Sequence, residues 1–368
     1  MMELSIIVPV YNGEKYLAEL LDSICSIKDI SVEILLVNDG SLDGSEKIIR
    51  SYQERDGRIR YLKKENGGIV SARNYGLQAA EGEYLFFADQ DDILDAGVLE
   101  TAIKKSKAAN ADMALFSTKC FNDNGKSWDC DTVWKAGHFN EHEVSDIFIR
   151  KLITRYAGDE GEIVSYIGHI WAAVIRRSLV KEHGIVFKRF MAIEDDLLFV
   201  LDTLNYAGSV ITMTEAGYYW RQNPDSRTRR GKYSVEHASK MRKYYEYRTD
   251  ILVKHGICTA EELQAYYTGV RQEFILNLLD NEAMWGHHKI IKACRLLQRY
   301  IKDEEMKAAL ADEPRCPLAQ RYTVEKRLLA GNRVYAAVLY KKVRYLKAIV
   351  GNKLKKYQFE RKRRRNCA

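Results

Sequence analysis

The sequence predicts an α/β fold, with a mostly parallel sheet flanked by helices, followed by a mainly helical C-terminal region. Two observations favour this fold class. Between Leu4 and Ala96, short runs rich in Val, Ile and Leu alternate with stretches of helical periodicity, an arrangement that requires right-handed crossovers between parallel strands. With 368 residues, 46% hydrophobic and 30% charged, the chain is long enough for one large domain or two ordinary ones, which excludes disorder as its main state.

Each element follows from its apolar pattern. The first expected strand, Leu4–Val10, is a β-branched apolar run of the buried parallel type, and further strands are expected at Glu33–Asn38, Ile59–Lys63 and Tyr84–Ala88. The expected helices show apolar residues at helical spacing: Glu14–Ile27, Leu42–Arg50, Ala72–Ala80 and a further one from Ala96. Pro9 is expected to end the first strand, because proline has no N–H to donate to an interior ladder.

Polar clusters follow three of these strands. They are Pro9–Asn12, Asp39–Ser41 and Asp89–Asp92. Each cluster alone is as compatible with a turn and a helix cap as with a site. Because ligands bind beyond the carboxyl ends of parallel strands, three clusters at one edge predict a common ligand crevice.

The acidic cluster Asp89–Asp92 points to a metal ion. Its three carboxylates within four residues repel one another unless a cation lies among them. Asp89 and Asp91 offer the hard oxygen ligands that Mg²⁺ or Mn²⁺ prefers, and such a cation also accepts diphosphate oxygens. Asp92 is expected either to accept a supporting hydrogen bond or to cap the next helix, with the cap favoured.

Two common phosphate-binding motifs are absent from the sequence. No Gly-x-Gly-x-x-Gly follows the first strand and no Gly-x-x-x-x-Gly-Lys-Ser/Thr occurs, which excludes a dinucleotide-binding dehydrogenase motif and a P-loop. Phosphate charge is instead expected to be met by the metal and by Arg73. An ordinary surface position on a helix is the alternative for Arg73.

Four motifs in order resemble one large family, the inverting glycosyltransferases with the Rossmann-like GT-A fold that assemble bacterial surface polysaccharides (glycosyltransferase family 2 type). The motifs are Ser5–Asn12, Val37–Ser45, Asn66–Asn74 and Asp89–Asp92. The resemblance is strong to about residue 100 and weaker to about Ser226. It implies a nucleotide-sugar donor, most often a UDP-sugar, and a divalent cation, Mn²⁺ or Mg²⁺.

The resemblance also implies a role for each matching residue. It implies contacts to the donor from Pro9 and Tyr11 along the base and ribose, Asp39 on the base, Arg73 at the diphosphate or ribose, and Asp89 with Gln90 on the ribose or sugar side. Asp91 matches the metal ligand, with Asp89 beside it. Gln90 stands where many relatives have Ser.

A second acidic motif, Ile193–Phe199, resembles the segment that provides the general base. When the motif is aligned on Glu194, the base is Asp195, which we favour. When it is aligned on Phe199, the base is Asp196. The alternative is an acidic helix N-terminus that complements the helix dipole. Trp171 resembles the segment preceding the base, but Ala172 and Ala173 replace its usual Asn-Lys.

Charge is concentrated at the end of the chain. The formal net charge is +7, from 58 Lys+Arg against 51 Asp+Glu, yet Lys341–Arg365 holds twelve Lys/Arg and one acid. One helical face would carry the apolar residues Leu339, Val343, Leu346, Val350, Leu354 and Tyr357. We expect residues 339–365 to contact an anionic membrane surface. The alternative is packing of the same apolar face on the helical region. Nucleic acid is not an expected partner, since no recognised binding motif accompanies the charge.

The expected domains are 1–226 for nucleotide-sugar binding and catalysis, 227–330 for a helical region and 331–368 for the basic tail. Seven cysteines, an odd number without a Cys-x-x-Cys pair, predict no disulfide framework and a reducing compartment. The start of the chain lacks the pattern of a signal peptide. We therefore expect a cytoplasmic protein, peripheral at the inner face of the membrane.

The expected function is transfer of a sugar from a nucleotide sugar to a hydroxyl group of a glycan or lipid-linked acceptor, by metal-assisted single displacement with an aspartate base. Two alternatives stay open at this point. One is a sugar nucleotidyltransferase, although Tyr11–Glu14 lacks the Gly-rich signature of that class. The other is a membrane-surface scaffold with a relict donor site.

Overall fold

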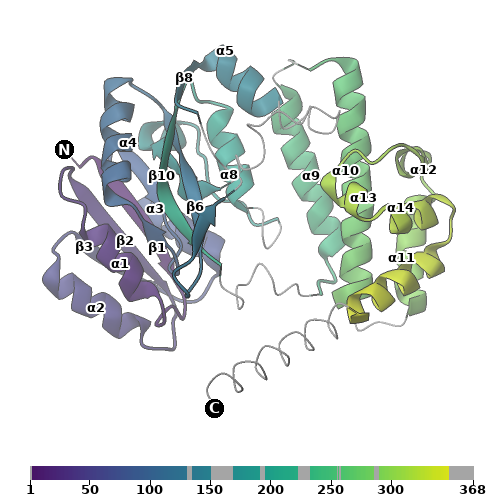
Figure 1. The fold of residues 1–368 in the computed structure, drawn as a ribbon, viewed down its shortest axis with the longest axis horizontal. Coiled ribbons are helices and arrows are strands. Elements are labelled where there is room, and N and C mark those ends of the chain that lie inside the picture. Colours follow the sequence, from purple (N-terminus) through teal and green to yellow (C-terminus); the bar gives the residue numbers. More distant parts are fainter. Residues whose placement is uncertain are drawn as a thin grey trace. The chain divides into compact units, whose positions relative to one another are not determined.

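The computed structural model describes residues 2–130, 135–150, 169–190, 195–222, 233–254, 256, 258–285 and 290–347. Expectations for Glu194, Ser226 and residues 348–365 lie outside this part of the chain. The described residues form two compact units, one from residues 2–222 with 247–254 and one from residues 233–246 with 258–347. Each unit is described by itself (Figure 1).

The first unit is built on one mixed sheet. Its strands are β1 (Leu4–Val10), β2 (Val32–Asp39), β3 (Ile59–Lys64), β4 (Tyr84–Phe87), β5 (Ile93–Leu94), β6 (Met113–Phe121), β7 (Ser127–Asp129), β8 (Gly137–Asn140), β9 (Ala173–Arg176) and β10 (Ser209–Arg221). The order across the sheet is β3-β2-β1-β4-β9-β6-β10-β5, with β7 beside β6 and β8 beside β10. β3, β2, β1 and β4 run parallel, while β9 is antiparallel to both of its neighbours. The α/β fold class expected from the sequence is confirmed.

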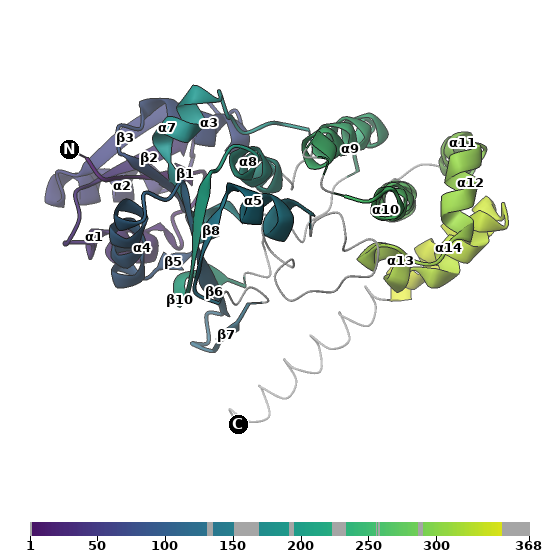
Figure 2. The ribbon, with the colours of Figure 1, turned by 90° about the horizontal axis from the view of Figure 1, so that it is seen from above.

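Helices cover both faces of this sheet. They are α1 (Leu17–Cys25), α2 (Ser45–Arg55), α3 (Ile69–Ala79), α4 (Ala96–Ala108), α5 (Glu141–Glu143), α7 (Arg177–Glu182) and α8 (Asp195–Leu204), with the π-helical turn η1 (Val144–Arg150) and the 3-10 turn η3 (Ile170–Ala172). Figure 2 shows α1 and α4 on one side of the strands and α3, α7 and α8 on the other. The chain first moves outward from β1 to β3 and then returns to β4. Because all of these crossovers are right-handed, the change of direction places α3 on the face of the sheet opposite α1.

Pro9 does not end the first strand, as the sequence suggested it would. β1 continues to Val10, and Pro9 lies opposite Val37 of β2. Pairing between β1 and β4 ends at Ile7, so Pro9 sits on a stretch of strand that is paired on one side only. Proline is tolerated where one side of the strand needs no donor.

The core explains why α3 can lie so close to the strands. All residues of β1 and β2 are buried. A Cβ atom at Gly76 of α3 would lie 2.5 Å from Ile7 Cγ2 and 3.1 Å from Val37 Cγ2. Glycine is therefore required at this contact, and it fixes the height of α3, and hence of Arg73 on it, above the sheet.

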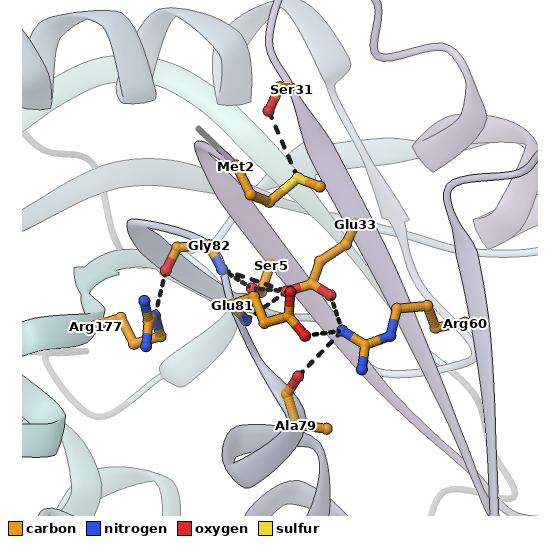
Figure 3. Close-up of polar contacts among 9 residues, drawn as sticks. All are labelled: Met2, Ser5, Ser31, Glu33, Arg60, Ala79, Glu81, Gly82 and Arg177. Atoms are coloured by element: carbon orange, nitrogen blue, oxygen red, sulfur yellow. Dashed lines mark hydrogen bonds and ion pairs between the residues drawn. The ribbon is translucent and has the colours of Figure 1, made fainter.

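The buried carboxylate of Glu33 joins the N-terminal ends of the parallel strands (Figure 3). Glu33, which is 3% exposed, accepts hydrogen bonds from Ser5 Oγ at 2.6 Å and from the Glu81 N–H at 2.6 Å, and it pairs with Arg60. Burial alone would raise the pKa of Glu33, but these hydrogen bonds outweigh burial and lower it. The starts of β1, β2 and β3 and the turn before β4 are thereby joined at the edge opposite the polar clusters.

One disulfide joins the β6–β7 hairpin to the residue that follows it. Cys120 and Cys130 are bonded, with their Cα atoms 5.4 Å apart. The sequence interpretation expected no disulfide, because residues ten apart carry no sign of pairing until the hairpin brings them together. Among the described residues, Cys25, Cys258, Cys294 and Cys316 are not part of a disulfide.

The second unit is helical. Its helices are the first part of α9 (His237–Lys254), α10 (Ala260–Asp280), η5 (Asn281–Trp285), α11 (Ile290–Ile301), α12 (Glu304–Ala311), α13 (Pro317–Arg321), α14 (Thr323–Ala330) and a last helix whose described residues are 334–347. The buried Gln272 amide of α10 donates to the carbonyls of Ala309 and Glu313, which ties α12 to α10. No helix among the described residues is long and apolar enough to cross a bilayer.

Candidate active site

The chain segments that follow β1 and β4 are tied to each other by Gln90. Gln90 Oε1 accepts from the Tyr11 N–H at 2.8 Å, and Gln90 Nε2 donates to the Tyr11 carbonyl at 3.1 Å. A Cβ atom at Gly13 would collide with the Gln90 amide. Gln90 therefore acts in the structure as a clamp on the loop after β1, a role that the sequence did not indicate.

Asp39, at the end of β2, is buried and used by the chain itself. Its carboxylate accepts from the Gly67 N–H at 2.9 Å, from the Gly68 N–H at 2.8 Å and from Lys64 Nζ at 2.6 Å. Gly68 has a φ of +84°, a backbone conformation that favours glycine. Asp39 thus shapes the loop that leads into α3, and the base contact expected for it stays a prediction.

Arg73, on α3, is the centre of the polar cluster. It is only 3% exposed, and it lies 5.3 Å above the centre of the Phe187 ring. Arg73 Nη2 donates to Asp89 Oδ1 at 3.0 Å and Nη1 donates to Asp195 Oδ2 at 3.0 Å, while Nη1 also binds Asp196. The structure thereby excludes the surface position considered for Arg73 and brings the two acidic motifs together.

The charge state of Arg73 follows from these contacts. Burial alone would lower the pKa of the guanidinium, but Asp196, Asp89 and Asp195 outweigh burial and raise it. The guanidinium therefore stays positively charged. Among the described residues, none accepts a hydrogen bond from Arg73 Nε.

Asp195 and Asp196 begin α8, where the helix dipole favours negative charge. Asp195 is 5% exposed, and the side chain of Asp196 is 19% exposed. Burial raises the pKa of both carboxyls, and the positive charge of Arg73 opposes that rise without cancelling it. Both aspartates contact the same guanidinium, so the geometry does not separate their roles.

Asp91 and Asp92, after β4, have different surroundings. Burial, and then the charge of Asp89, raise the pKa of Asp91 to about 6. Asp92 is fully enclosed and accepts from Tyr218 Oη at 2.8 Å and from the Arg221 N–H at 2.7 Å. The favoured expectation that Asp92 caps the next helix is wrong, because Asp95 caps α4 by accepting from the Val98 N–H.

Aromatic side chains from β10 and η3 support the acidic loop. Tyr218 Oη accepts from the Asp89 N–H at 2.9 Å while donating to Asp92. Trp171 stacks on Tyr218 with ring centres 4.9 Å apart, and His169 stacks on Trp171 at 4.3 Å. Tyr218 is thus a site-supporting residue that the sequence did not indicate, since nothing local marks its hydroxyl.

Arg221, at the end of β10, is engaged elsewhere. Its Nη1 binds Asp123 at 2.8 Å, its Nη2 binds Glu19 at 2.5 Å, and its Nε donates to the Asp91 carbonyl at 2.7 Å. Tyr16 and Phe121 rings lie 4.3 and 4.4 Å from the guanidinium. Arg221 therefore holds the acidic loop through its contacts with Asp91 and Asp92, while its ion pairs are with Asp123 and Glu19.

A metal site built by the protein alone is not found among the described residues, in which no three His, Cys, Asp or Glu side chains cluster suitably. Asp89 and Asp91 provide two carboxylates at the end of β4, of which Asp89 is already paired with Arg73. No side chain in the described part of the chain donates a hydrogen bond to the Asp91 carboxylate. This pair is the candidate cation site.

Comparisons with known proteins agree with this architecture. The sequence pattern described as "Glycosyl transferase family 2" matches residues 5–184. The chain is 27% identical over 268 residues to the uncharacterized glycosyltransferase EpsJ of Bacillus subtilis, covering 71% of this chain and 74% of that protein. It is 42% identical over 150 residues to glycosyltransferase GlyA of Streptococcus pneumoniae, covering 41% of this chain but only 20% of that protein.

A solved structure extends the likeness to nearly the whole chain. Residues 1–349 of Staphylococcus aureus TarS in complex with UDP-GlcNAc superpose with a TM-score of 0.61 at 22% identity, covering 94% of this chain and 92% of that one. At this identity the likeness establishes the fold, which is therefore GT-A with a helical C-terminal region. The family match confirms the resemblance seen in the sequence and does not support the nucleotidyltransferase alternative. The chain therefore carries a glycosyltransferase family 2 region, residues 5–184.

Proposed function

We propose that this chain is an inverting glycosyltransferase that moves a sugar from a nucleotide sugar to a hydroxyl group of a glycan or lipid-linked acceptor. The observation that carries the proposal is Arg73, whose guanidinium binds Asp89 after β4 and Asp195 at the start of α8, each at 3.0 Å. A donor-side carboxylate and a candidate base therefore lie beside one buried cation. A single displacement requires such proximity.

In this displacement the acceptor oxygen forms a bond to the anomeric carbon while the bond from that carbon to the diphosphate oxygen breaks. The nucleoside diphosphate leaves with the bonding electron pair, and the hydroxyl proton passes to a carboxylate. Asp195 is our choice for this base and Asp196 is the alternative, since both bind Arg73 in the first turn of α8. Burial raises the pKa of both, which strengthens them as bases.

A divalent cation, Mg²⁺ or Mn²⁺, would be held by the carboxylates of Asp89 and Asp91. The pKa of Asp91, raised to about 6 by burial and by Asp89, indicates that the ionised pair lacks sufficient counter-charge. Mg²⁺ is commonly held by one or two carboxylates together with phosphate oxygens of the substrate. Bound there, the cation would stabilise negative charge on the departing diphosphate.

The nature of the donor and acceptor is supported by relatives. The solved TarS structures include complexes with UDP and with UDP-GlcNAc, and TarS is described as a poly(ribitol-phosphate) beta-N-acetylglucosaminyltransferase. Another relative, 30% identical over 226 residues, is a minor teichoic acid biosynthesis protein of Bacillus subtilis. We accordingly propose a UDP-sugar as donor and a hydroxyl of a surface polymer or its lipid-linked precursor as acceptor.

The test is a panel of nucleotide sugars assayed for nucleoside diphosphate release and for protection against thermal melting, with Mn²⁺, with Mg²⁺ and with a chelator. We expect one UDP-sugar to raise the melting temperature and to be turned over only when metal is present. NMR of the product should show the anomeric configuration inverted. Retention of configuration would contradict the single displacement, and a panel without either binding or turnover would contradict the donor assignment.

A further inference from the structure

The last described helix, residues 334–347, which we call the terminal helix, uses one face to pack on its own unit. Val334, Ala337, Val338 and Lys341 are each at most 3% exposed. Their spacing of three, one and three residues places them on one side of a helix. This face, and not the one containing Leu339, is the packed face.

Ion pairs strengthen that packed face. Lys341 Nζ lies 2.6 Å from Asp280 Oδ1 of α10 and 3.1 Å from the centre of the Tyr322 ring. Arg344 Nη1 lies 3.1 Å from Glu325 Oε1 of α14, and Glu325 is fully buried. Because buried carboxylates need these cations, the rotation of the terminal helix about its own axis is fixed.

The opposite face is apolar and exposed. It carries the apolar stripe, which we define as Tyr335, Leu339, Val343 and Leu346, with exposed fractions of 58%, 43%, 43% and 58%. Spacings of four, four and three residues keep these side chains on one side of the helix. The sequence alternative, in which Leu339, Val343 and Leu346 pack on the helical region, is therefore wrong for the described residues.

Positive charge borders the apolar stripe on both sides. At 100° per residue, Lys342 falls on one flank of Leu339 and Lys347 on the other. Between Lys326 and Phe359 the sequence contains no Asp or Glu, and the stripe's spacing continues in the sequence through Val350, Leu354 and Tyr357. Lysines beside an apolar stripe can extend toward headgroups while the stripe inserts between acyl chains.

We propose that the apolar stripe of the terminal helix is a docking surface for an anionic lipid bilayer. The packed face explains why the stripe cannot turn inward, and the basic border selects a negatively charged partner surface. The bound helix lies in the plane of the interface, with Lys342 and Lys347 over anionic headgroups. This proposal stands apart from the proposed glycosyl transfer, because binding to vesicles requires neither donor nor acceptor.

The experiment is vesicle flotation of the full chain with phosphatidylcholine alone and with phosphatidylcholine mixed with phosphatidylglycerol. We expect binding to the anionic vesicles only, and weaker binding as salt is added. Replacing the stripe by Leu339→Gln, Val343→Gln and Leu346→Gln is expected to abolish flotation. A charge variant, Lys342→Glu with Lys347→Glu, should weaken binding by about fivefold or more for each lysine.

The matched control is Val235→Gln, Ile291→Gln and Val324→Gln, which removes three other exposed apolar side chains of the same unit, 82%, 59% and 42% exposed. It is expected to float like the unmodified chain. Unchanged flotation of the stripe variant, or equal binding to neutral vesicles, would overturn the proposal. So would sedimentation showing a dimer that the stripe variant converts to monomer without any vesicle binding, because the stripe would then join two copies of this chain.

Discussion

Arg73 Nη1 donates to Asp195 Oδ2 at 3.0 Å, although 122 residues separate them in the sequence. The contact joins α3, which connects the parallel strands β3 and β4, to α8, which the chain reaches only after β6 and β9. Since the same guanidinium binds Asp89, one side chain sets the spacing between the two acidic motifs.

Replacing Arg73 by Ala should damage stability as well as turnover. Three carboxylates would lose their shared cation, and breaking a buried pair typically costs about 3–5 kcal/mol of unfolding free energy. The free energy of unfolding of Arg73→Lys should lie between those of the unmodified chain and Arg73→Ala. Lysine keeps the positive charge, but its single ammonium group cannot reproduce the planar, forked hydrogen bonds of a guanidinium. Urea unfolding checks this prediction.

The control for Arg73 is Lys104→Ala, which removes a cation from an exposed pair with Asp29 at 3.0 Å. Exposed pairs contribute up to about 1 kcal/mol, so this change should be nearly silent. If Arg73→Ala unfolded at the same urea concentration as the Lys104 variant, the buried cluster would have no structural role.

Asp195→Asn and Asp196→Asn, made separately, should identify which of the two aspartates is the general base. The variant that loses the base should lose about 10²–10⁴-fold in kcat, because general base catalysis contributes that much. It should keep its donor-induced rise in melting temperature, since neither aspartate is a proposed donor ligand. Asp129→Asn, an exposed carboxylate on β7, serves as control. Turnover within tenfold of the unmodified enzyme in both variants would place the base elsewhere.

Glu33→Ala should affect stability alone. It leaves the Ser5 hydroxyl, the Glu81 N–H and Arg60 without their acceptor at the edge opposite the site, at a cost of roughly 3–5 kcal/mol of unfolding free energy. Glu81→Ala is the matched control, because Glu81 also pairs with Arg60 but its side chain is 73% exposed. Weakened donor affinity in Glu33→Ala under conditions where it is fully folded would contradict this assignment.

His169 should make stability depend on pH. Burial lowers the pKa of His169 from 6.5 to about 4, so the unfolded chain binds a proton between these values and the folded chain does not. The free energy of unfolding is therefore unaffected by the protonation of His169 above pH 6.5, and it falls as the pH drops from 6.5 toward 4. Between pH 7 and pH 5 the loss is on the order of 1–2 kcal/mol for a shift of this size. His169→Phe, which keeps an aromatic ring against Trp171, should unfold with a shallower pH dependence than the unmodified chain, and identical slopes would contradict it.

The fold was accessible from the sequence because local patterns decide it. The runs Leu4–Val10 and Ile34–Val37 are mostly Val, Ile and Leu, and parallel strands buried on both faces favour that pattern. What escaped prediction depends on distant neighbours. Pro9 remains in its strand because β4 stops pairing at Ile7, and Cys120 meets Cys130 only once a hairpin forms.

The candidate site was accessible in part, for the same reason. The motifs at strand ends identify Asp89, Asp91 and Arg73, but no local signal shows that Arg73 is buried against Asp195. The supporting roles of Tyr218 and Asp92 come from a contact across 126 residues. The carboxylate of Asp39 and the amide of Gln90 were expected near the donor, and the structure shows that each also holds a loop of the chain.

The most direct test of the account is nucleoside diphosphate release from a UDP-sugar by the unmodified chain and by Asp91→Asn, in the presence of Mn²⁺, with Asp129→Asn as control. The account assigns Asp91 to the cation that supports the departing diphosphate, so turnover should depend on metal and fall by at least about 10²-fold in Asp91→Asn alone. Metal-dependent turnover that survives in Asp91→Asn would contradict the proposed site.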